Sequence, residues 1–178
     1  PVDGTTNFVH RLPYCAVSVA VLYRRRPVVG VVYNPVREEL FSASARRGAT
    51  LNGRAIGVRA AARTLGAAVV STNVGYDRSP AGVEFMLDMQ RALLLAKVRS
   101  LRMGGSAALE MCHVAAGHMD AYYEFGPHIW DIAAGVCILL EAGGVVCDPR
   151  HGALQWHSRR TLACATPDLA AEMVPLLA

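Results

Sequence analysis

The sequence has few charged residues and almost no lysine. Only 18% of its 178 residues are charged, and 17 of its 18 basic residues are arginine. Hydrophobic residues make up 53%, a composition that excludes a disordered chain and predicts a folded domain with a large core. The arginines are scattered, so no basic stripe indicates a nucleic-acid partner. The one run, Arg24-Arg25-Arg26, precedes Pro27 and is interpreted as a solvated hairpin turn.

Long hydrophobic runs and paired cysteines are also missing. The longest apolar stretches, 14–23 and 129–142, are too short to cross a bilayer, so we expect no membrane segment. The five cysteines are odd in number and form no C-x-x-C pair, which favours a reducing, cytoplasmic environment. Because the sequence begins at Pro1 and not at Met, we expect that an N-terminal part of the protein lies outside it.

Two catalytic patterns are absent as well. The six histidines show no zinc-binding spacing, so core or surface roles are expected for them. No serine or cysteine stands in a nucleophile-elbow pattern. The sequence therefore gives no sign of a covalent intermediate on serine or cysteine.

Hydrophobic periodicity divides the chain into two parts. In the first, 1–75, a period close to two predicts an antiparallel meander with strands at 17–23, 28–33 and 40–45, a hairpin at Asn52-Gly53, and a further buried strand at 65–72. In the second, 76–178, helical and strand patterns alternate. Helices are expected at 81–98, 106–116, 128–142 and from 167, and strands near 103 and at 120–124, 145–146 and 161–165. Together they predict one α/β unit, 1–178, with two sheets.

Asp131 stands at the start of a predicted helix that is apolar almost all round, so we expect this carboxylate to be buried and to need a partner. As a first-turn residue it can accept hydrogen bonds from free backbone N–H groups. Alternatively it is a metal ligand at a site where the helix start also faces an anion. The two roles are compatible.

A second polar group lies in the opening segment, 1–8. On its own, Asp3-Gly4-Thr5 is a common turn. Here a carboxylate, a glycine that lets the backbone approach a ligand, and the two hydroxyls of Thr5 and Thr6 can together hold a hard cation and a phosphate.

These two segments carry a family resemblance. PVDGTTNFVHRLPYCAVSVAV resembles the first signature of the inositol monophosphatase family, and HIWDIAAGVCILLEAGG resembles the second, 128 positions later from Asp3 to Asp131. The intervening RMGGSAALEMCHVAAGHMDAYYEFG is also similar, so the resemblance covers essentially the whole chain. It implies an αβαβα sandwich in which a mainly antiparallel sheet is followed by a mixed sheet. It also implies a Mg²⁺-dependent, lithium-inhibited phosphatase, a cytoplasmic homodimer with an inositol phosphate substrate and no nucleic-acid or membrane partner.

The resemblance also assigns roles to residues. Asp3, Asp131 and the carbonyl of Val2 match metal ligands. Thr5 matches the hydroxyl that orients the attacking water, and the amides of Gly4 and Thr5 match those that meet the phosphate. The catalytic set is thus Asp3, Thr5 and Asp131.

The substrate-binding positions match Asp3, Gly105, Ser106, Ala107, Glu124 and Asp131. We expect Glu124 to accept hydrogen bonds from the ring hydroxyls, since a carboxylate can accept two at once. The family's pattern has a further aspartate and a glutamate ahead of the position of Pro1. The first metal site, and the helices that cover the first sheet, are therefore expected to be incomplete in this sequence.

Two alternatives remain open. One keeps the chemistry and changes the leaving group, as in related sugar-phosphate, histidinol-phosphate or nucleotide phosphatases. The other is a non-catalytic, truncated homologue that acts as a binding protein.

Overall fold

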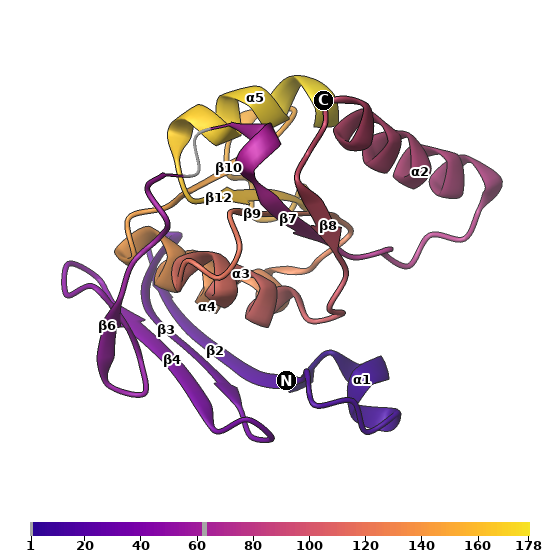
Figure 1. Cartoon of the computed structure of the whole chain (residues 1–178). Coiled ribbons are helices and arrows are strands. Elements are labelled where there is room, and N and C mark those ends of the chain that lie inside the picture. Colours follow the sequence, from indigo (N-terminus) through magenta and orange to yellow (C-terminus); the bar gives the residue numbers. More distant parts are fainter. Residues whose placement is uncertain (1, 62–63) are drawn as a thin grey trace.

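Helices and sheets alternate in four layers in the computed structural model, which describes residues 2–61 and 64–178 (Figure 1). Helices α2 (Pro80–Leu95) and α5 (Pro167–Leu177) cover the outer face of one six-stranded sheet. Helices α3 (Ala107–Ala115) and α4 (Ile129–Glu141) lie between that sheet and the other. The described residues thus form layers αβαβ, and the last helical layer of the expected αβαβα sandwich is not among them.

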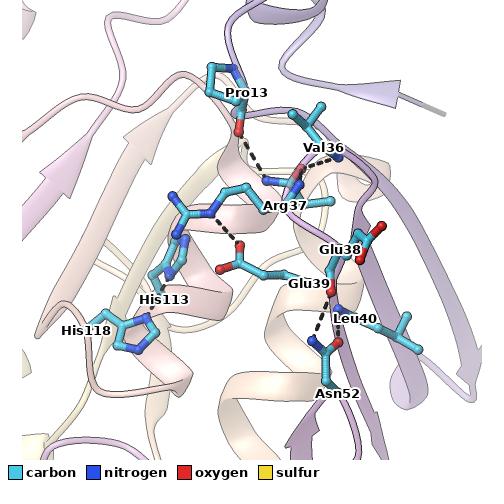
Figure 2. Close-up of polar contacts among 10 residues, drawn as sticks. Pro13, Val36, Arg37, Glu38, Glu39, Leu40, Asn52, His113 and His118 are labelled. Atoms are coloured by element: carbon cyan, nitrogen blue, oxygen red, sulfur yellow. Dashed lines mark hydrogen bonds and ion pairs between the residues drawn. The ribbon is translucent and has the colours of Figure 1, made fainter.

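The first sheet is the predicted antiparallel meander. Its strands follow sequence order, each paired with the next: β1 (Val2–Asp3), β2 (Ala16–Tyr23), β3 (Arg26–Asn34), β4 (Glu39–Ser44), β5 (Ala49–Leu51) and β6 (Arg54–Ile56). Asn52 and Gly53 take left-handed φ angles of 49° and 77°, which confirms the predicted hairpin between β5 and β6. The Asn52 amide also donates to Glu38 O and accepts from Leu40 N, so its side chain joins this hairpin to the start of β4 (Figure 2).

The second sheet is mixed, as expected. Its order is β11-β10-β12-β9-β7-β8, and only β7 pairs in parallel, with β8 and β9. The strands are β7 (Val69–Thr72), β8 (Ser100–Arg102), β9 (Ala121–Phe125), β10 (Val145–Asp148), β11 (Gly152–Ala153) and β12 (Arg160–Cys164).

The prediction for 65–72 was partly wrong. Leu65–Ala67 forms a short 3₁₀ helix, and only Val69–Thr72 is extended. This strand joins the second sheet, so the predicted antiparallel part, 1–75, contains one strand of the mixed sheet. A short apolar run shows neither its exact ends nor its partner, because those depend on the strands that lie beside it.

The two inner helices form the centre of the core. All nine residues of α3 are buried, and so is α4 from Ile132 to Leu139. The α4 helix packs directly on β3, where a Cβ added to Gly30 would lie only 2.5 Å from Ala134 O. In the described chain, no helix has the length and apolar character that a bilayer crossing requires.

Helix ends follow local backbone signals. Gly143, at φ 90°, ends α4 as predicted. In contrast, α2 ends at Leu95, short of the predicted residue 98, because Lys97 takes a left-handed φ of 62° and Val98 N donates to Leu93 O. The sequence offered no glycine to indicate that end.

Candidate active site

A cavity of about 500 Å³ opens where β1, β9 and the starts of α1 (Thr5–Val9), α3 and α4 meet. Eight of the ten residues singled out from the sequence line it: Asp3, Gly4, Thr5, Thr6, Gly105, Ala107, Glu124 and Asp131. The fold therefore brings together residues up to 128 positions apart, from Asp3 to Asp131. Val2 and Ser106 are not among the lining residues.

Asp3 connects the first sheet to the start of α3. Its Oδ2 accepts hydrogen bonds from Ser106 Oγ at 2.5 Å and from Ala108 N at 2.9 Å. Burial raises the pKa of Asp3; these hydrogen bonds oppose that effect, and the negative charge of Asp131 adds to it. Both carboxylates line the same cavity.

Ser106 supports the site from behind. Its hydroxyl donates to Asp3 and accepts from Leu109 N at 3.3 Å, so it is the N-cap of α3. The side chain is 1% exposed. The Ser106 side chain therefore does not line the cavity, although the residue was predicted among the substrate-binding positions.

Asp131 corrects one expectation and confirms another. It is partly exposed, not buried, because the first turn of α4 borders the cavity, and the adjacent Trp130 is 54% exposed. Its Oδ2 accepts from His128 N at 2.8 Å, which confirms the predicted capping role at the helix start.

Glu124, at the end of β9, is held by two side chains. Its Oε2 accepts from the Tyr122 hydroxyl and from Asn73 Nδ2, the latter at 2.9 Å. Burial raises the pKa of Glu124, the two hydrogen bonds lower it, and the charges of Asp3 and Asp131 raise it further. Three carboxylates thus line one cavity, although among the described residues they are not arranged to hold one metal ion together.

Two asparagines that were not among the predicted site residues hold the segments around this cavity together. Asn73 Oδ1 accepts from Gly105 N at 2.8 Å, so this amide joins Glu124 to the loop before α3. Asn7 Nδ2 donates to Tyr14 O and Gly104 O, each at 2.7 Å. Asn7 lay inside the quoted opening segment, whereas Asn73 lies in a polar loop with no signal of its own.

The carboxylate oxygens around the cavity are ligands that suit a hard cation better than zinc. In residues 2–61 and 64–178, no group of three or more His, Cys, Asp or Glu side chains is arranged to hold a metal. Asp3 and Asp131 accept their hydrogen bonds at Oδ2, and a carboxylate has a second oxygen to offer a cation. Mg²⁺ is commonly held by one or two carboxylates, with phosphate oxygens and waters as the other ligands.

The histidines have the core and surface roles expected of them. His113 is 7% exposed, stacks on Tyr14 and lies 3.0 Å from the exposed His118, measured between their Nδ1 atoms (Figure 2). Burial, with the His118 and Arg37 charges, lowers the pKa of His113 to about 4. It is therefore neutral at physiological pH.

An apolar cavity of about 300 Å³ adjoins the first one. The two cavities share residues 73–76, and the lining of the apolar cavity also includes Phe85, Met86, Met89 and Phe125. Tyr76 borders both and is 79% exposed. Its pKa is raised, first by partial burial and then by the charges of the three site carboxylates, so its phenol lies within their field.

The whole chain, residues 1–178, matches the model of the inositol monophosphatase family. It is 46% identical over 177 residues to an inositol monophosphatase from Dictyostelium discoideum, covering 99% of this chain and 64% of that protein. The crystal structure of extragenic suppressor protein suhB from Bartonella henselae superposes with a TM-score of 0.91 at 37% identity, covering 99% of this chain and 66% of that one. The 2′AMP-bound structure of SaIMPase-II gives 0.85 at 26% identity, covering 98% and 65%. The chain spans about three fifths of the length of the curated relatives it matches.

Proposed function

The chain belongs to the inositol monophosphatase family, and on that premise we propose that the protein hydrolyses inositol monophosphates to inositol and phosphate in a metal-dependent reaction. The observation that supports this most directly is the meeting of Asp3, Glu124 and Asp131 in one cavity. We further propose a cytoplasmic homodimer, as the family resemblance implies.

The two aspartates and the Val2 carbonyl are the groups we assign to Mg²⁺. When bound, Mg²⁺ supplies positive charge to the phosphate and lowers the pKa of a coordinated water. The Thr5 hydroxyl, exposed in the cavity, orients the attacking water. The amides of Gly4 and Thr5 are assigned to the phosphate, as the family resemblance implies.

Glu124 positions the leaving alcohol. Its Oε2 is already engaged by Tyr122 and Asn73, which leaves Oε1 to accept hydrogen bonds from the hydroxyls of the inositol ring. Because Asn73 also holds Gly105, the ring-facing carboxylate and the loop before α3 keep a fixed separation. Fixed acceptors favour a polyol over a simple alkyl phosphate.

Phosphate release from inositol 1-phosphate, measured on the protein at its natural length, tests this function. We expect turnover that requires Mg²⁺, stops in a chelator of divalent cations, is inhibited by millimolar Li⁺, and survives chelators that remove zinc alone. Turnover without Mg²⁺, or no hydrolysis of any inositol monophosphate, would contradict the proposal.

The apolar cavity favours a second candidate, a phosphatase for nucleoside monophosphates. Phe85, Met86 and Phe125 offer an aromatic and aliphatic surface next to the carboxylates, where a base can lie. The test is kcat/KM on adenosine 2′-monophosphate and on glycerol 2-phosphate, in the protein and in Met86→Gln. A preference for the nucleotide that the substitution reduces supports this candidate, and equal efficiencies exclude it.

A further inference from the structure

A third cavity, of about 640 Å³, lies between the β2–β3 hairpin and the loop that precedes β12. It shares no lining residue with the catalytic cavity. We propose that it binds a small polyanion, namely a metabolite that carries two or more phosphate groups. This site does not depend on the phosphatase function.

Charge is the first observation behind this proposal. Arg24, Arg25 and Arg26 all line the cavity, and across from them lie the polar side chains of His157 and Ser158. None of the described lining residues carries a carboxylate. Within residues 2–61 and 64–178, the three arginines form no ion pair with Asp or Glu. Adjacent like charges repel one another, and an anion between them removes that repulsion.

Backbone conformation is the second, independent observation. Tyr23 pairs with Arg26, so Arg24 and Arg25 are the two central residues of a tight hairpin, with left-handed φ angles of 49° and 63°. Such turns favour Asn-Gly, because side chains with a Cβ are strained there. The β5–β6 hairpin of this same chain has Asn52-Gly53 at that place. Single arginines elsewhere in the chain, such as Arg46, also take a left-handed φ, so what distinguishes this turn is that arginine fills both central positions beside a cavity.

The turn is also fixed relative to the opposite side of the cavity. Trp156 Nε1 donates to Arg25 O at 2.9 Å, which joins the hairpin to the loop before β12. Arg24 rests over the Tyr23 ring, with its Cζ 5.4 Å from the ring centroid. A binding site whose backbone is already held in place loses less entropy when a ligand binds.

Phosphate groups are the ligand chemistry that this arrangement suits. A guanidinium presents a planar pair of donors that matches two phosphate oxygens, and three such groups exceed what one phosphate needs. The volume lies within the range of small-molecule sites. We therefore expect tighter binding of a compact polyphosphate than of a single phosphate.

Titration with inorganic tripolyphosphate in metal-free buffer at about 0.15 M salt tests the site. Trp156 fluorescence is the readout, in a Trp130→Phe background that leaves it as the single tryptophan. We expect saturable binding, at least tenfold tighter than for orthophosphate. The double variant Arg24→Asn/Arg25→Gly should lose at least tenfold in affinity while unfolding at the same or higher urea concentration, because it relieves the strained turn.

The matched control is Arg46→Gln/Arg47→Gln, which removes the same charge from the β4–β5 turn, outside this cavity. It should bind tripolyphosphate as the unmodified protein does. Equal losses in both double variants would reduce the effect to net charge, and absence of saturable binding would refute the site. Phosphatase activity of the Arg24→Asn/Arg25→Gly variant is expected to be unchanged, so failure here is distinguishable from failure of the proposed function.

Discussion

Asp131 caps α4 through its hydrogen bond from His128 N while it borders the cavity that also contains Asp3 and Glu124. The sequence alone left a capping role and a ligand role side by side, and the structure shows that the first does not exclude the second. A carboxylate at a helix start is therefore not evidence against a metal site. The two roles separate in a substitution that keeps the cap and removes the charge.

We expect Asp131→Asn to lower kcat at least about 100-fold and to leave the fold intact. The Asn carbonyl can still accept from His128 N, but it brings no negative charge to a cation. Phosphate release and urea unfolding are the measurements. Asp131→Ala, which also removes the cap, should lose about 1 kcal/mol of stability in addition. Activity of Asp131→Asn within about tenfold of the unmodified protein would exclude the ligand role.

Glu124→Gln should change substrate preference. The Gln side chain has one acceptor oxygen where the carboxylate has two. The group that accepts the hydrogen bond from Asn73 is therefore changed as well. We expect kcat/KM on inositol 1-phosphate to fall by about tenfold or more, about 1.4 kcal/mol, with a smaller loss on glycerol 2-phosphate. Glu84→Gln, on the exposed side of α2, is the control for charge. Equal losses on both substrates would show that Glu124 does not contact the ring.

Charged candidate residues could be predicted from the sequence, whereas amides could not. Asp131 stood out as a carboxylate in an apolar segment, whereas the roles of Asp3 and Glu124 came from the family resemblance of the segments that contain them. Asn73 has no such context, because asparagine in a loop is ordinary turn chemistry. Its importance arises only when β7 and β9 pair and bring Glu124 beside it.

Elements are best predicted where the periodic pattern is long. The meander of 16–56 and the helices α2 to α5 were all expected, because their hydrophobic patterns are long enough to be recognised. The two-residue strands β1 and β11 and the five-residue α1 were not, since they are too short to show a period. Such pieces are fixed by tertiary partners, as β1 is by the pairing of Val2 with Val17.

The contact between β3 and α4 gives a prediction at this scale. In Gly30→Ala the new methyl group would meet Ala134 O at 2.5 Å and Cys137 Cβ at 2.8 Å, so the helix must move away from the sheet. We expect a loss of about 1–3 kcal/mol in the free energy of unfolding. Gly66→Ala, with open space around the added Cβ, should be neutral or slightly stabilising. Urea unfolding compares the two, and similar stabilities would contradict the close packing.

Glu110 is a buried carboxyl group whose ionisation affects the stability of the whole molecule. It is fully buried, and its Oε1 accepts from Gly104 N at 2.7 Å. Burial raises the pKa of Glu110 from 4.5 to about 7. The folded state therefore favours the protonated form, and the stability that this contributes is present below pH 4.5 and lost as the pH rises through 7.

Glu110→Gln should remove that pH dependence. The amide keeps the acceptor for Gly104 N and carries no charge. We expect the variant to gain stability over the unmodified protein as the pH rises from about 5 to about 8, by about 3 kcal/mol at the upper end. Urea unfolding across this range measures it, and parallel stability curves would contradict a buried, titrating carboxylate.

The order of strands in the second sheet has a consequence for biosynthesis. β12 lies between β9 and β10, although it is made after both. While a ribosome synthesises residues 126–159, the edge of β9 that β12 will cover has no native partner. An open strand edge is a template for pairing with other chains. A chain that pauses during this interval is therefore most exposed to aggregation, and β12 is the segment whose arrival ends that risk.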